Sequence, residues 1–203
     1  MTYKIVNLQN WAKQYVLDPN SQNRGSKCAV PTAGGNENNY NEIYPGLFLG
    51  DRKIAMDKNS LKELGITHVI NCAQGQRSIF VNTDAKYYKD MGIKFYGIKA
   101  SDTESFDISK FFRPTANIIH QALEKGGKVL VHCVSGVSRS STIVIAFLML
   151  KRRMTFREAI KSVREKRCIC PNDGFMTQLC VLHHELFGVQ ELPNRRSHKC
   201  IIL

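Results

Sequence analysis

One short segment combines a thiol, several small residues and an arginine in a spacing that suits the binding of an anion. It reads Val129-Leu130-Val131-His132-Cys133-Val134-Ser135-Gly136-Val137-Ser138-Arg139-Ser140. The apolar residues before Cys133 predict a buried strand, and the residues after Arg139 predict a helix. The five residues between Cys133 and Arg139 are enough for a loop whose backbone N–H groups surround a phosphate. We therefore expect residues 134–138 to bind the substrate.

The same loop would ionise the thiol at its base. A cysteine with an unperturbed pKa of ~8.5 is only about 3% thiolate at pH 7. A helix N-terminus and nearby cations can lower that pKa to roughly 3.5–7.5, and Arg139 can direct two N–H donors at phosphate oxygens. We therefore expect Cys133 to attack phosphorus and form a phosphocysteine, which water hydrolyses. A buried structural cysteine is the alternative, but the strand, loop, arginine and helix would then coincide by chance.

A leaving alkoxide or phenolate needs a proton, which a nearby carboxylic acid can supply. Asp102, Glu104 and Asp107 all follow the predicted strand Ile93–Ile98. Asp102 lies four residues past that strand, in a loop that could hang over the mouth of the site. Its position favours Asp102 and leaves the other two carboxylates open.

Alternating strand and helix patterns from about residue 43 must position these groups. We expect strands at 47–49, 66–71, 93–98 and 129–132, and helices at 60–64, 108–125, 140–152, 155–166 and 175–187. This order predicts an α/β fold with a central, mostly parallel sheet flanked by helices. We divide the chain into an N-terminal extension and linker (1–41), a catalytic domain (42–188) and a basic tail (189–203).

Composition excludes several classes of protein. The longest apolar run, Ile143–Leu150, has eight residues, whereas a membrane helix needs about 20. The first ten residues are mostly polar and do not form a secretory leader. The seven cysteines are irregularly spaced and the histidine pair His183-His184 does not suit zinc. We expect a cytoplasmic protein with reduced thiols, no metal and no cofactor.

The charge of the chain favours anionic partners. The formal net charge is +12, from 29 basic and 17 acidic residues. The stretch Lys151–Cys170 carries eight bases against two acids, Glu158 and Glu165. A solvated helix face explains this stretch equally well. Because no aromatic and basic stacking platform accompanies it, we do not expect a nucleic-acid partner.

These motifs resemble a known family. One motif is similar to the signature of the cysteine-dependent protein phosphatases. It consists of His132-Cys133, five further residues, and then Arg139-Ser140. Three further stretches resemble the VHR-type atypical dual-specificity phosphatases, and the overall similarity runs from about Glu42 to Leu186. They are Gly65–Asn71, Gly97–Thr103 and Pro171–Phe175.

The resemblance implies the cysteine-dependent phosphatase fold and a role for each residue of the motif. Cys133 would be the nucleophile, Arg139 the phosphate clamp, and Asp102 the general acid and later the general base. Ser140 would stabilise the thiolate as it leaves, and His132 would orient the loop.

Three more residues receive supporting roles from the resemblance. Asn71 and Asn172 would support the site from behind, although a purely structural role in the core fits them equally well. Arg167 would help to hold the substrate phosphate, with a plain surface base as its alternative.

The resemblance also implies the substrate class. A shallow cleft would accept phosphotyrosine and phosphothreonine or phosphoserine in proteins, with MAP kinases among the substrates that the family suggests. Val134, Ser135 and Val137 make the loop less polar than in VHR-type enzymes, which puts substrate preference in doubt. The loop also lacks the lysines of phosphoinositide phosphatases. The alternatives are a phosphopeptide-binding scaffold, a phosphoinositide phosphatase and an RNA 5′-phosphatase.

The chain ends in Lys199-Cys200-Ile201-Ile202-Leu203, which fits a prenylation signal on Cys200. One lipid holds a protein only reversibly. Three bases near it (Arg195, Arg196 and Lys199) would add on the order of 3 kcal/mol on an anionic membrane. The tail is similar to that of the prenylated regenerating-liver phosphatases, and we expect the protein on the cytosolic face of membranes. An unmodified apolar end is the alternative.

Overall fold

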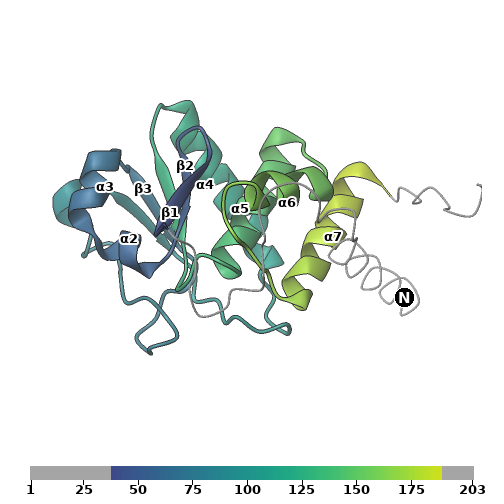
Figure 1. Cartoon of the computed structure of the whole chain (residues 1–203), viewed down its shortest axis with the longest axis horizontal. Helices are drawn as coiled ribbons and strands as arrows, with labels where there is room; N and C mark the ends of the chain where they lie inside the picture. Colours follow the sequence, from purple (N-terminus) through teal and green to yellow (C-terminus); the bar gives the residue numbers. More distant parts are fainter. Residues whose placement is uncertain (1–37, 189–203) are drawn as a thin grey trace, which may run out of the picture.

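The computed structural model describes residues 38–188 (Figure 1). The tail with Cys200 and most of the predicted N-terminal extension lie outside the described residues. The first strand begins at Tyr40, two residues before the predicted start of the catalytic domain at Glu42. The division into three parts therefore stays a prediction.

A five-stranded sheet forms the centre of the molecule, in the order β1-β2-β5-β3-β4. The β1–β2 pair is antiparallel, and the other three pairs are parallel. Every residue of the central strand β5 is buried, as expected for a strand covered on both faces. The strands are β1 (Tyr40–Tyr44), β2 (Leu47–Gly50), β3 (His68–Asn71), β4 (Lys94–Gly97) and β5 (Val129–His132).

Helices cover both faces of this sheet (Figure 1). The residues of α2 (Arg52–Met56) and α3 (Lys58–Leu64) pack with Phe48 and Leu130 on one face. The residues of the longer helices pack with Leu49 and Val131 on the other. These longer helices are α4 (Phe112–Glu124), α5 (Arg139–Arg152), α6 (Phe156–Arg164) and α7 (Asp173–Phe187), and two short 3₁₀ turns are η2 (Lys89–Met91) and η3 (Ser109–Phe111).

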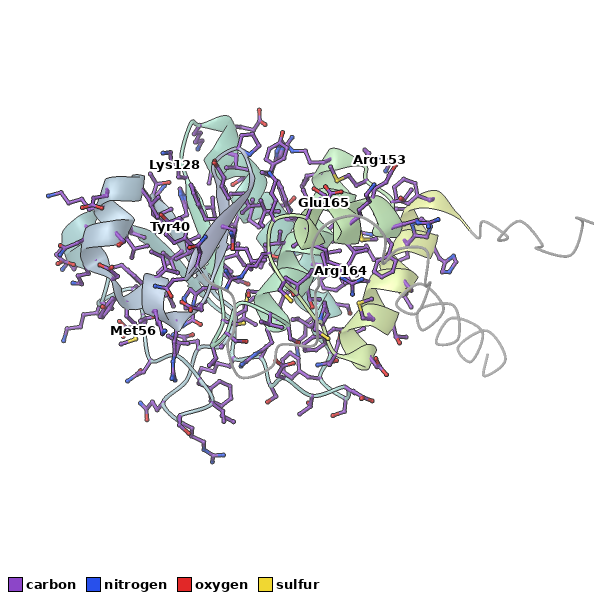
Figure 2. All side chains as sticks on the ribbon, viewed as in Figure 1. Tyr40, Met56, Lys128, Arg153, Arg164 and Glu165 are labelled. Carbon is purple, nitrogen blue, oxygen red and sulfur yellow. The ribbon has the colours of Figure 1, made fainter. Side chains whose placement is uncertain are left out.

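The helix that follows the anion loop, α5, is the centre of the larger layer. Residues from Arg139 to Met149 are all buried, because α5 contacts β5, α4, α6 and α7. A helix that is apolar around its whole circumference is typical of such a position. Figure 2 shows the side chains that fill the space between the helices and the sheet. The start of α5 is therefore fixed by the packing of the whole layer.

The predicted fold class and the predicted strands and helices are confirmed. Thr155 and Glu158 form the capping box of α6, and Gly65 ends α3 in the left-handed conformation. Pro114 lies in the first turn of α4, where the missing N–H has no helical partner to lose. β1, α2 and η2 were not predicted, and the first residues of the helix predicted at 108–125 form the 3₁₀ turn η3 instead of α-helix. No helix within residues 38–188 is long and apolar enough to cross a membrane.

Candidate active site

The anion loop lies at the carboxyl end of the central strand. β5 ends at His132, and β2 and β3 pair with it so that Gly50 and Asn71 lie beside His132. Cys133 is the next residue, and α5 begins at Arg139 after the loop 133–138. The carboxyl ends of parallel strands and the N-terminus of a helix thus meet at Cys133, as in other α/β binding sites.

The sulfur of Cys133 is buried and accepts hydrogen bonds from two sides. Its Sγ lies 3.2 Å from the N–H nitrogen of Gly136 and 3.2 Å from the Oγ of Ser140. Burial acts to raise the pKa of Cys133, but the donors on Ser140 and Gly136 and the charge of Arg139 outweigh it. The pKa of Cys133 is therefore below its ordinary value, and the site favours the thiolate.

A second thiol nearby, that of Cys72, shows that the surroundings of a cysteine decide whether its sulfur is ionised. Cys72 follows Asn71 on the adjacent strand and is also fully buried. Burial raises its pKa well above the ordinary value, the charge of Cys133 raises it further, and Arg139 only partly offsets this. The surroundings thus favour the ionised form of Cys133, whereas Cys72 stays a neutral core residue.

Within residues 38–188, no side chain caps the N–H groups at the start of α5. Ser138 occupies the N-cap but makes no side-chain hydrogen bond to the first turn of the helix. Its hydroxyl instead donates to Oδ1 of Asp102 at 2.6 Å. N–H groups in the first turn of a helix have no helical partner and attract anions. A phosphate above Cys133 would therefore meet free donors.

Arg139 connects the anion loop to two other loops. It is 6% exposed, and its Nη1 donates to the carbonyl oxygens of Ala100 at 3.2 Å and Ile79 at 3.4 Å. Its Nε lies 3.4 Å from Oδ2 of Asp102. These contacts hold the guanidinium beside the loop, where it can turn two donors toward a phosphate.

The structure places Asp102 at the mouth of the site, between Ser138, Arg139 and Asn172. The Nδ2 of Asn172 donates to Oδ1 of Asp102 at 3.0 Å. The other two candidate carboxylates lie elsewhere: Asp107 accepts from Ser109 in η3, and Glu104 packs its backbone against Gly174. Of the three, Asp102 is the one held against the anion loop, which supports its role as the acid.

Two asparagines hold segments that carry the site. Nδ2 of Asn71 donates to the Val81 carbonyl at 2.9 Å and to Oγ1 of Thr83 at 3.0 Å, and so fixes the loop that offers Ile79 to Arg139. Asn172 caps α7 through Phe175 at 3.0 Å while it also holds Asp102. Both residues therefore contact neighbours of the site, and their supporting roles stay predictions.

His132 is buried and neutral. Burial lowers its pKa to about 4, and the hydrogen bond to the Cys133 carbonyl only partly offsets this. Its Nδ1 lies 3.2 Å from that carbonyl oxygen, so Nδ1 carries the proton of the neutral ring. Its role in orienting the loop stays a prediction.

Arg167 braces the anion loop through its backbone. Its Nε donates to the Gly136 carbonyl at 3.0 Å, and its Nη2 donates to the Ser135 carbonyl at 3.1 Å. Its Nη1 donates to Asn38 and Asn41, at 3.0 and 2.9 Å. The structure thus brings Arg167 to the loop carbonyls, and its predicted contact with the substrate phosphate stays a prediction.

Gly136 has no room for a side chain. Its φ is +69°, and a Cβ there would lie 2.6 Å from the Gly50 carbonyl oxygen and 2.6 Å from Nη2 of Arg167. The left-handed conformation turns its N–H toward the Cys133 sulfur while its carbonyl accepts from Arg167.

Several contacts around the site were not predicted from the sequence. The carbonyls of Ile79 and Ala100, which hold Arg139, carry no side-chain signal. Asn41, which lies in the predicted linker, contacts Arg167. Gln178 of α7, whose Oε1 accepts from the N–H groups of Ile108 and Ser109 at 2.9 Å, anchors the segment after Asp102.

Such a fold and such a loop define a cysteine-dependent phosphatase domain, and comparison with known proteins specifies its class. The family model described as "Dual specificity phosphatase, catalytic domain" matches residues 47–185. The chain therefore belongs to the dual-specificity phosphatase family, as an atypical member, and is a protein tyrosine/serine/threonine phosphatase.

Several known proteins are similar to this chain in sequence or in structure. The chain is 51% identical over 150 residues to human (Homo sapiens) dual specificity protein phosphatase 13B, covering 73% of this chain and 75% of that one. It is 50% identical to the Mus musculus protein of the same name, covering 72% and 73%. The crystal structure of human tyrosine phosphatase-like serine/threonine/tyrosine-interacting protein matches with a TM-score of 0.64 at 36% identity, covering 72% and 96%. DUSP15 matches with a TM-score of 0.63 at 30% identity, covering 72% and 88%.

Ser140→Ala should raise the pKa of Cys133. A hydrogen bond to a charged group contributes about 1.5–3 kcal/mol, so its loss should raise the pKa by about one to two units. The rate of alkylation of Cys133 by iodoacetamide, followed by mass spectrometry across pH, should therefore reach half its maximum at higher pH than in the wild type. Ser141→Ala is the control, because its hydroxyl donates to the Val137 and Ser138 carbonyls and not to the sulfur. Equal midpoints for both variants would contradict the assignment.

Arg167→Lys should weaken phosphate binding even though it keeps the positive charge. An ammonium cannot reproduce the planar donors that span the Ser135 and Gly136 carbonyls. We expect at least a tenfold rise in the inhibition constant of vanadate, measured against an aryl phosphate. Arg164→Lys, at the last residue of α6 and outside these hydrogen bonds, should leave it unchanged. Wild-type inhibition of Arg167→Lys would show that charge alone matters at this position.

Proposed function

We propose that this phosphatase hydrolyses phosphotyrosine and phosphoserine or phosphothreonine in proteins through a phosphocysteine on Cys133. The observation that carries the proposal is the sulfur held by Gly136 and Ser140, with a pKa below its ordinary value. Arg139 would clamp the phosphate, Asp102 would be the acid and then the base, and Ser140 would stabilise the leaving thiolate.

In the first step, the loop N–H groups and Arg139 would hold the substrate phosphate with phosphorus above the sulfur. The Cys133 thiolate attacks in line, so that an S–P bond forms as the bond to the leaving oxygen breaks. Asp102 gives its proton to that oxygen, which leaves as an alcohol or phenol. A substrate phosphate would take the place of Asp102 as the partner of Arg139, which lies 3.4 Å from it in the free protein.

In the second step, Asp102, now a carboxylate, would accept a proton from a water molecule that attacks the phosphocysteine. The S–P bond breaks and inorganic phosphate forms. The charge that returns to Cys133 would be met by the hydroxyl of Ser140, 3.2 Å from the sulfur. Because the same donors hold the thiolate before and after reaction, the loop needs no rearrangement to complete the cycle.

We further propose a shallow, VHR-type cleft. Val134 and Val137 line the loop with apolar side chains, and Ile79, which is 62% exposed, lies on the loop that contacts Arg139. Apolar walls suit the ring of phosphotyrosine and the methyl group of phosphothreonine.

The scaffold alternative would require a missing catalytic group, whereas Cys133, Arg139 and Asp102 are all present. The less polar loop does not favour a phosphoinositide or an RNA end. MAP kinases stay a proposal based on the family.

The decisive experiment compares leaving groups. Asp102→Ala should retain most of its kcat on aryl phosphates whose phenols leave easily and lose roughly 10²–10⁴-fold on phenyl phosphate or a phosphothreonine peptide. Asp107→Ala is the matched control and should behave as the wild type on both. Cys133→Ser should be inactive on every substrate. Equal losses of Asp102→Ala on good and poor leaving groups would remove it from the role of acid, and activity of Cys133→Ser would overturn the phosphocysteine.

We also propose that a prenyl group on Cys200 and the bases beside it tether the enzyme to the cytosolic face of membranes. The support is the sequence Cys200-Ile201-Ile202-Leu203 after Arg195, Arg196 and Lys199. The division into extension, catalytic domain and tail belongs to the same proposal.

Cys200→Ser should abolish membrane association without changing catalysis. The full chain should take up radiolabelled geranylgeranyl from its diphosphate in a reticulocyte lysate and sediment with phosphatidylserine vesicles. Cys200→Ser should do neither, whereas kcat/KM on an aryl phosphate should be equal for both proteins. Cys170→Ser, which removes a cysteine that is exposed within residues 38–188, is the control. Label in Cys200→Ser, or none in the wild type, would refute the tether.

A further inference from the structure

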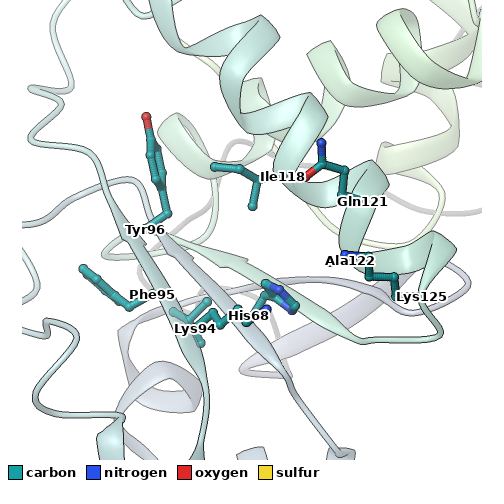
Figure 3. A pocket seen from close by; sticks show the side chains of 9 residues that line it. His68, Lys94, Phe95, Tyr96, Ile118, Gln121, Ala122 and Lys125 are labelled. Carbon is teal, nitrogen blue, oxygen red and sulfur yellow. The ribbon is translucent and has the colours of Figure 1, made fainter.

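A groove of about 250 Å³ lies between the edge strand β4 and the carboxyl-terminal half of α4 (Figure 3). Its floor is formed by β3 and β4 and its wall by α4. The lining residues are His68, Val69, Lys94, Phe95, Tyr96, Ile118, Gln121, Ala122 and Lys125. None of the residues placed in the phosphatase site belongs to it.

The groove exists because α4 covers the sheet only in part. In the register of β3 and β4, Ile70 lies beside Tyr96 and His68 lies beside Lys94. Ile70 is fully buried, whereas Tyr96 and His68 are only partly buried and Lys94 is exposed. The face of β4 next to α4 therefore offers an aromatic ring and an apolar surface that the helix does not cover.

The outer edge of β4 is also available for pairing. β4 is the last strand of the sheet within residues 38–188. Its inward N–H groups include those of Lys94 and, just past its end, Ile98, which donate to the Thr67 and Asn71 carbonyls at 2.9 and 2.8 Å. Because alternate residues of a strand point their backbone groups in opposite directions, those of Phe95 and Gly97 face outward. Such an edge can accept another extended segment.

Positive charge surrounds this apolar surface. Of the nine lining residues three are basic, His68, Lys94 and Lys125, and none is acidic. Lys94 and Lys125 are exposed. Burial lowers the pKa of His68, and the charges of Lys94 and Lys125 lower it further, so His68 is neutral and the two lysines carry the positive charge of the groove. An occupant that brings carboxylates would therefore be attracted and one that brings bases would be repelled.

We propose that this groove binds an extended segment of a partner protein that pairs with β4, places aliphatic side chains against Tyr96 and Ile118, and directs Asp or Glu toward Lys94 and Lys125. Main-chain pairing supplies affinity and the side-chain contacts supply selectivity in such a mode. The outward N–H and C=O groups of β4 favour a peptide, because a peptide can pair with them as a further strand. A nucleic acid or a lipid has no backbone that could form this pairing. The inference goes beyond the proposed function and does not depend on it.

The first test measures binding of a fluorescent peptide, Asp-Glu-Leu-Val-Leu-Glu-Asp, to the full chain by anisotropy. The double variant Lys94→Glu/Lys125→Glu should bind at least tenfold more weakly. Lys62→Glu is the matched control, since this base lies on α3 over the other face of the sheet and should leave binding unchanged. Hydrolysis of an aryl phosphate should be unchanged in all three proteins. Equal binding by the double variant and the wild type, or no binding by the wild type, would overturn the proposal.

Further measurements distinguish strand pairing in the groove from binding at Cys133, self-association and membrane contact. A peptide with N-methyl groups on alternate amides keeps its side chains but loses main-chain donors, so its binding should fall at least tenfold. Saturating vanadate should not displace the peptide; displacement would place it at Cys133. Sedimentation should give the same mass for the wild type and the double variant, and phosphatidylserine vesicles should bind both equally. A dimer or a vesicle interaction lost in the double variant would assign the groove to a second copy or a membrane instead.

Discussion

The hydrogen bonds that hold an ionised sulfur inside the protein are the interaction on which the rest of the structure depends. A buried charge without partners is costly, so Cys133 must be surrounded by donors before it can be useful. Gly136 and Ser140 supply them at 3.2 Å, from the loop and from the first turn of α5. Both donors reach the sulfur only because β5 ends and α5 begins within a few residues, and the packing around α5 fixes that geometry.

The N–H of Gly136 points toward the Cys133 sulfur, and the carbonyl groups of the loop lie on its opposite side. The carbonyls of Ser135 and Gly136 then point away from the ligand and need donors of their own. Arg167, which is 3% exposed, donates to both. The two arginines of the site are therefore not equivalent: Arg139 stands beside the ligand position and Asp102, whereas Arg167 holds the loop in the shape that the ligand requires.

Much of this could be predicted from sequence, because the signals were local. The run before Cys133 is apolar throughout, and the capping box at Thr155 needs only two residues in the right order. β1 gave no such signal, because only Ile43 of its five residues is buried and its pairing with β2 defines it. α2 is five residues long, too short to show a period. The partners of Arg167 and Arg139 are mainly carbonyl oxygens, which every residue has, so only the fold could reveal them.

The topology also separates the anion loop from the groove in which we propose that a partner protein binds. In the proposed mechanism the loop holds the phosphate through N–H groups and one buried arginine, so it does not need the lysines spread over the surface. β5, at the centre of the sheet, delivers the nucleophile, while β4, at its edge, leaves backbone groups and an apolar face beside Lys94 and Lys125. Because none of the residues placed in the phosphatase site lines this groove, a partner bound there would leave the thiolate undisturbed.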